Sequence, residues 1–168
     1  MNDTMSRLWD EIQKVPTHER LLAIAHFGPH ELRLDAATLL TETCVDREHL
    51  LAVIELFPMH PITVRAGKQI LADDEATPLQ LATVMAEVPP LADEVAARIL
   101  SLGQPNTILT KVVLYSPKHR ERAWTELLTR PDLTSLLIIG NGLPEFQERV
   151  QATIHTKDPT FLALLRGD

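Results

Sequence analysis

The chain has little of several residue types, and each shortage argues against a class of protein. Among 168 residues there is one cysteine, Cys44, so no disulfide can form within the chain. Aromatic residues make up 4% of the sequence, whereas strands are usually rich in aromatic and β-branched residues. No apolar run approaches the roughly 20 residues that cross a bilayer. These shortages argue against a disulfide-stabilised, an all-β and a membrane-spanning protein.

Sequence motifs of catalysis and metal binding are also missing. There is no glycine-rich phosphate loop, nucleophile elbow, Cys-x-x-Cys pair or His-Glu-x-x-His segment. His26 and His30 have the spacing of a zinc-binding pair on a helix, but Gly28 and Pro29 interrupt any helix between them. Cys44 is expected in an inter-helix turn as a small, partly buried thiol. We therefore expect a protein that is not an enzyme and holds no metal or other cofactor.

Leu, Ala, Val and Ile dominate the apolar residues, and Leu and Ala are strong helix formers. Five prolines, which recur at intervals of 27 to 31 residues, separate apolar segments of helical spacing. They are Pro29, Pro58, Pro89, Pro117 and Pro144. Self-similarity at such a period is typical of stacked helical repeats.

Capping residues and breakers place the expected helices. Thr17, Asp46 and Thr77 are suited to cap helix N-termini, and Gly28 and Gly103 to end helices. The expected helices are 4–15, 18–27, 30–42, 47–57, 62–71, 78–88, 91–102, 107–115, 117–129, 133–141, 144–155 and 159–165. They form five antiparallel pairs with one further helix at each end, in a single all-α domain over residues 1–168. The expected repeats are 17–43, 46–72, 77–103, 106–130 and 132–156.

Two of these repeats resemble a known family. The run 61–67 (Pro-Ile-Thr-Val-Arg-Ala-Gly), followed by Ile70 and Leu71, resembles the second helix of a HEAT repeat, and so does 32–37 with the leucines that follow it. The resemblance, or that to the shorter leucine-rich-repeat variant, implies a right-handed α-α superhelix (solenoid). The repeat, the acidic charge and the missing catalytic motifs predict that this solenoid binds another protein on its inner surface, which the second helices line. Residues 77–82 resemble the start of an ankyrin repeat, but this pattern occurs only once and has Gln80 in place of histidine.

Aligning the second helices gives a column of mostly charged residues, which are Leu34, Arg65, Glu94, Arg122 and Arg149. This column is either a stripe that contacts a partner or a structural ladder of ion pairs between repeats. Trp124, in a column of otherwise smaller residues, either fills a void or anchors an interface. The predicted contact residues are Arg65, Lys68, Glu94, Arg98, Arg122, Trp124, Glu126 and Arg149.

The charge distribution bears on the partner. The net charge is −7, with −8 over residues 1–100 and +1 over residues 101–168. An acidic chain repels the phosphates that dominate nucleic-acid affinity. We therefore expect a protein partner, with nucleic-acid binding through the basic C-terminal region as the alternative and a ligand pocket in the curve of the solenoid as a third interpretation. We also expect no membrane association and a cytoplasmic location. The last helix, with Phe161, Leu164 and Leu165 on one face, either caps the domain or forms a homodimer.

Overall fold

The computed structural model describes residues 3–14 and 17–157, and this part of the chain is all-α. Helices account for 80% of it, and it contains no strand. The expected fold class is thus confirmed at the level of secondary structure. The chain divides into two compact units, residues 1–91 and 92–168, which are described separately.

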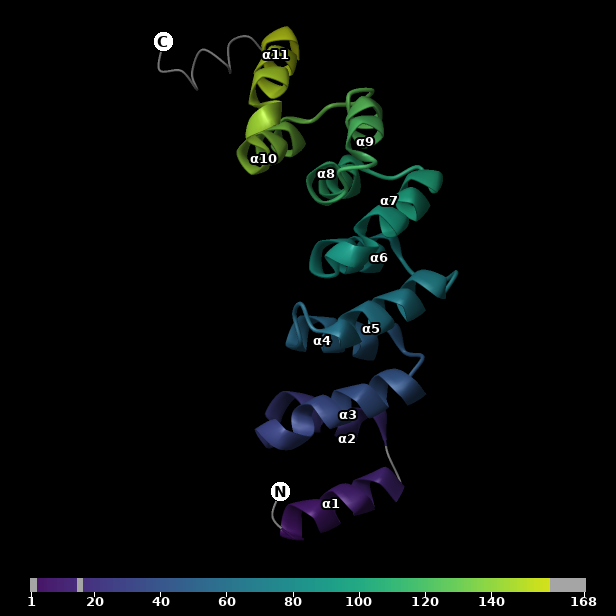
Figure 1. The fold of residues 1–168 in the computed structure, drawn as a ribbon. Coiled ribbons are helices and arrows are strands. Elements are labelled where there is room, and N and C mark those ends of the chain that lie inside the picture. Colours follow the sequence, from purple (N-terminus) through teal and green to yellow (C-terminus); the bar gives the residue numbers. More distant parts are fainter. Residues whose placement is uncertain (1–2, 15–16, 158–168) are drawn as a thin grey trace. The chain divides into compact units, whose positions relative to one another are not determined.

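The first unit contains six α-helices in its described residues and a short 3₁₀ helix (Figure 1). They are α1 (Asp3–Lys14), α2 (His18–Phe27), α3 (His30–Thr43), α4 (Arg47–Leu56), α5 (Pro61–Ala72), α6 (Pro78–Glu87) and η1 (Pro89–Leu91).

The described residues of the second unit form five α-helices and a second 3₁₀ helix. They are α7 (Ala92–Ser101), α8 (Asn106–Tyr115), α9 (Arg120–Leu127), α10 (Leu133–Gly142), η2 (Pro144–Phe146) and α11 (Gln147–Lys157). The helix expected at 159–165, with Phe161, Leu164 and Leu165, lies outside the described residues. None of the helices described in either unit is both long and apolar enough to cross a membrane.

Side-chain caps begin several helices where the sequence predicts them. The Thr17 hydroxyl accepts a hydrogen bond from the Arg20 amide at 3.3 Å, and the Asp46 carboxylate accepts one from the His49 amide at 3.1 Å. Thr77 and Gln80 cap α6 reciprocally, each side chain accepting from the other's amide. These bonds satisfy amides that have no partner within the helix.

The expected start of the helix over 117–129 is wrong, because α9 begins only at Arg120. Residues 117–119 form a turn instead. The Ser116 hydroxyl, which could have capped a helix here, is buried and donates to the Asp93 carboxylate at 2.6 Å. The side chain that was expected to start the helix therefore links the end of α8 to α7.

Two further helices begin differently from the expectation. The segments expected as 91–102 and 144–155 open with the 3₁₀ turns η1 and η2, so α7 and α11 begin at Ala92 and Gln147. Such turns are frequent at helix N-termini. Each ends on a buried apolar side chain, Leu91 or Phe146, which is only 3% exposed.

The first unit is built in two layers. Helix α4 packs beside α2 and α6 in one layer, and α5 packs beside α3 and η1 in the other. Within each pair, α2 packs against α3 and α4 against α5. The core between them includes Leu21, Ala36, Leu40 and Val53, and Trp9 of α1 belongs to the same buried cluster.

The second unit follows a similar plan. Helix α8 packs against α7, α9 and α10, and α10 packs against α11. Val112 of α8, Ala123 and Leu127 of α9 and Ile139 of α10 are fully buried. Burial of these apolar side chains holds the helices of the unit together.

Gly67 lies where α5 approaches α6 and η1 most closely. A Cβ atom at this position would lie 2.8 Å from Leu91 Cδ1 and 3.0 Å from Val84 Cγ1. Those distances are shorter than van der Waals contact, so the absence of a side chain permits this packing.

We predict that Gly67→Leu lowers the free energy of unfolding by about 1–3 kcal/mol, because the added side chain has no room between α5, α6 and η1. Urea unfolding followed by circular dichroism measures the change. Ala97→Leu, at an exposed position of α7, is the matched control and should change stability by less than about 0.5 kcal/mol. Equal stabilities for the two variants would contradict the packing described for Gly67.

Candidate functional site

A groove of about 610 Å³ runs between α2 and α4 in the first unit. Its floor and walls are mostly apolar, with two glutamates and two histidines among the lining residues. The lining comprises Glu19, Leu22, Ala23, His26, Phe27, His49, Ala52, Glu55 and Leu56. The groove is open to solvent, since several of these side chains are exposed.

The same short sequence occurs in both helices that form the groove. Leu-Leu-Ala stands at 21–23 in α2 and again at 50–52 in α4. The first leucine of each run, Leu21 or Leu50, is buried and anchors its helix. The alanines, Ala23 and Ala52, line the groove, and their short side chains leave space in its middle.

Phe27 is the most exposed large apolar residue that lines the groove. It is 83% exposed at the last position of α2, and its ring meets the ring of His26 edge to face at 4.1 Å between centroids. Gly28 then ends the helix, its amide donating to the Ile24 carbonyl at 2.9 Å. The chain thus leaves the helix directly after Phe27, and the ring stays in solvent.

Polar groups lie at the other end of the groove. His49 Nδ1 donates to Asp46 Oδ1 at 2.9 Å, and this bond holds the pKa of the Asp46 carboxyl below its ordinary value. The ring of His18 lies 6.1 Å from that of His49, between centroids. The bond to Asp46 fixes the orientation of the His49 ring where it borders the groove.

Two features of the described residues bear on metal binding and on nucleophilic chemistry. Among residues 3–14 and 17–157, no group of three or more His, Cys, Asp and Glu is placed to hold a metal ion. Cys44, 2% exposed in the turn between α3 and α4, is a poor nucleophile because burial raises the pKa of its thiol. The arrangement of the groove is suited to burying apolar side chains.

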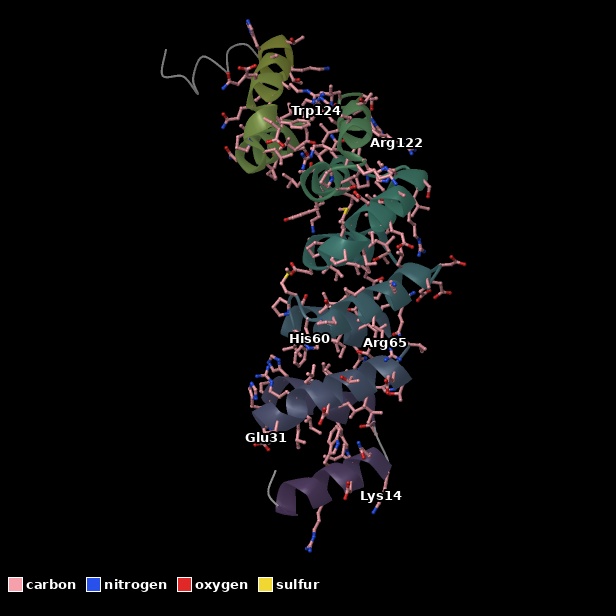
Figure 2. All side chains as sticks on the ribbon, viewed as in Figure 1. Lys14, Glu31, His60, Arg65, Arg122 and Trp124 are labelled. Atoms are coloured by element: carbon pink, nitrogen blue, oxygen red, sulfur yellow. The ribbon has the colours of Figure 1, made fainter. Side chains whose placement is uncertain are left out.

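Two of the predicted contact residues lie together on α5. Arg65 Nη1 forms an ion pair with Glu42 Oε1 of α3 at 2.9 Å, and Figure 2 shows Arg65 on α5. Arg65 and the exposed Lys68 border a shallow hollow of about 450 Å³. In the first unit, therefore, Arg65 of the charged column pairs with a residue outside the column, on the preceding second helix.

Arg149 of α11 is held by three side chains of the second unit. Its guanidinium donates to both carboxylate oxygens of Glu121 on α9, at 2.7 and 2.9 Å. Its Cζ atom also lies 5.2 Å from the ring centroid of Trp124 and 4.5 Å from that of Phe146. These contacts tie α11 and η2 to α9.

Trp124 is 2% exposed, and its ring packs edge to face against Phe146 at 5.2 Å between centroids. It fills space inside the second unit, the first of the two roles that the sequence left open. Figure 2 shows Arg122, two residues earlier, on the opposite side of α9 from Trp124.

The other predicted contact residues lie on the outer parts of α7 and α9. Glu94 and Arg122 are exposed, and Arg98 and Glu126 are half-buried. Of the eight residues, the structure brings together Arg65 with Lys68, and Trp124 with Arg149. A single surface formed by all eight stays a prediction.

The groove was not predicted from the sequence, because the predicted contact residues lie on the second helix of each pair. The groove lies on the first helices, α2 and α4. The repeated Leu-Leu-Ala and the apolar Phe27 next to Gly28 were the available signals. They gain meaning only once α2 and α4 are known to pack side by side.

Comparison with known proteins identifies no relative. No family model matches the chain, and neither does any curated protein or solved structure with which it was compared. The resemblance to HEAT repeats therefore rests on the residues quoted for it above.

We predict that Arg149→Ala lowers the free energy of unfolding by about 1–2 kcal/mol, because it removes the ion pair and the contacts with two aromatic rings. Arg149→Lys should recover only part of the loss, since an ammonium group cannot bind both oxygens of Glu121 while covering the rings. Arg122→Ala, at an exposed position on the opposite side of α9, is the control. An Arg149→Ala protein as stable as the control would contradict the role given to this cluster.

The same cluster predicts a pH dependence. The hydrogen bonds from Arg149 hold the pKa of Glu121 below its ordinary value of 4.5. The carboxylate therefore contributes stability that is full at neutral pH and is lost as the pH falls below 4.5 through the lowered pKa. We expect the stability difference between the parent and Glu121→Gln, measured by urea unfolding, to shrink over that range. A difference that stays constant down to pH 3 would contradict the prediction.

Proposed function

We propose that this protein is a non-enzymatic scaffold or adaptor that binds another protein through the α2–α4 groove. One observation carries the proposal: an open apolar groove with a solvent-exposed phenylalanine at its edge. Exposed apolar patches bordered by polar residues commonly mark protein-binding sites. The proposed fold is a right-handed HEAT-like solenoid of about five antiparallel helix pairs.

A recurring contact supports the proposed repeat. Arg33 Nε of α3 donates to the Ala25 carbonyl of α2 at 2.8 Å. In the second unit, Arg120 Nε of α9 donates to the Val113 carbonyl of α8 at 2.9 Å. In both pairs an arginine of the second helix satisfies a carbonyl near the C-terminus of the first. A repeated structural unit is expected to place the same hydrogen bond in more than one helix pair.

The charges of the second unit favour a protein partner over nucleic acid. Arg120 pairs with Glu145 at 3.0 Å, and Arg149 pairs with Glu121 at 2.7 Å. Carboxylates thus neutralise two of the basic residues that a phosphate backbone would need. The single cysteine, a buried thiol, suits a reducing compartment, and we propose the cytoplasm as the location.

We predict that a photo-reactive phenylalanine analogue at position 27 crosslinks to a discrete partner protein when the full chain is expressed in its native cells. The same analogue at Leu79, which is 63% exposed on α6 and does not line the groove, is the control. Mass spectrometry identifies the adducts. Phe27→Ala should weaken capture of that partner by about tenfold or more, as truncation of an aromatic residue that anchors an interface does. Adducts of equal yield at both positions, or none at position 27, would contradict the proposal.

Alanine at Lys68, Glu94 and Arg122 tests the predicted surface on the second helices separately. These side chains are exposed, so their removal should leave folding intact. If the groove is the binding site, capture of the crosslinked partner is expected to stay within about twofold of the parent. Loss of capture in this variant would move the contact surface to the second helices.

A further inference from the structure

The shape of the groove matches the face of one α-helix. The lining residues of α2 fall at 19, 22, 23, 26 and 27, and those of α4 at 49, 52, 55 and 56. Both sets follow the spacing of one helical face, over about two turns. The two faces lie side by side, since α2 packs against α4 in the same layer. An occupant that lies along the groove can therefore contact both helices over that length.

The floor of the groove accepts apolar side chains in a row. Ala23 and Ala52 leave room in the middle, while Leu22, Leu56 and Phe27 supply apolar walls. A helix lying in a groove places side chains at i, i+3 or i+4, and i+7 on its buried face. An extended peptide would instead gain its affinity by pairing with a sheet edge, and the described residues contain no strand.

The charges at the edges of the groove favour an occupant of one charge sign. Glu19, in the first turn of α2, and Glu55, in the last turn of α4, are both exposed. None of the described residues that line the groove is a lysine or an arginine. Residues 1–91 as a whole contain 14 aspartates and glutamates against 7 lysines and arginines. This potential attracts a basic segment and repels the phosphates of nucleic acids and anionic lipids.

We infer that the α2–α4 groove binds an amphipathic helix of a partner protein whose apolar face is flanked by lysines or arginines. Its apolar side chains fill the floor above Ala23 and Ala52 and cover the Phe27 ring. Its basic residues pair with Glu19 and Glu55. The inference rests on the proposed function, to which it adds the secondary structure and the charge of the partner.

The test is selection from a displayed library of helical peptides that is randomised without bias in charge. The 168-residue chain is the target, and the affinity of each enriched peptide is then measured in solution. We expect enriched peptides to carry apolar residues at i, i+3 or i+4, and i+7, with a net positive charge. Their affinity should fall steeply as the salt concentration rises, because screening weakens the ion pairs at the edges.

Variants of the protein assign the selected peptides to the groove. Ala23→Trp, at an exposed position, obstructs the floor and should weaken binding at least tenfold. Phe27→Ala removes an apolar wall of the groove and should also weaken peptide binding. The double variant Glu19→Lys/Glu55→Lys should weaken binding about tenfold. Glu87→Lys, at an exposed position of α6 that does not line the groove, is the matched charge control and should leave affinity unchanged.

The possible results separate the inference from the proposed function. Peptides that depend on Ala23 and Phe27 but are neutral or acidic would overturn the inference and leave the proposed function standing. Self-association by light scattering that Ala23→Trp abolishes would assign the groove to a second copy of the chain and would also overturn the inference. If no enriched peptide depends on the groove and position 27 yields no crosslink in cells, the proposed function fails as well.

Discussion

The packing of the first unit depends on close contact between helices at positions where small residues are buried. Ala36 and Ala37 of α3 and Ala66 and Gly67 of α5 are fully or almost fully buried. Helices approach one another most closely where such residues face the neighbour. One helix pair alone would leave one of its apolar faces in water, so α4 and α5 bury theirs against the helices on either side. The groove follows from this constraint, because α2 and α4 are held together by their buried faces while their outer faces stay open.

Much of the helical structure was predictable, because local chemistry determines where these helices begin and end. Thr17, Asp46 and Thr77 cap helices as their residue types predict, through bonds to amides three residues on. The prediction failed where a side chain had a tertiary partner. Ser116 donates to Asp93, 23 residues earlier, in place of capping its own helix. A local reading of sequence cannot weigh such a bond, since it forms only when α7 and α8 are packed.

The candidate site was less predictable than the fold. The alignment of second helices placed Arg65 and Arg149 in one column, but their carboxylate partners, Glu42 and Glu121, belong to other columns. Trp124 stands out in the sequence because the other residues of its column are smaller. Only its burial against Phe146 shows that it fills space inside the unit and does not anchor an interface. The groove required the side-by-side packing of α2 and α4, which is tertiary information. Periodicity alone does not reveal which apolar face of a helix is left uncovered, so the sequence pattern does not single out the lining of the groove.

The proposed binding surface is formed by the open faces of α2 and α4. Methyl NMR of the protein labelled at alanine and leucine, titrated with the partner segment that crosslinks at position 27, tests it most directly. We expect shift changes concentrated at Leu22, Ala23, Ala52 and Leu56. Changes confined to the methyl groups of α3 and α5, with these four unaffected, would contradict it.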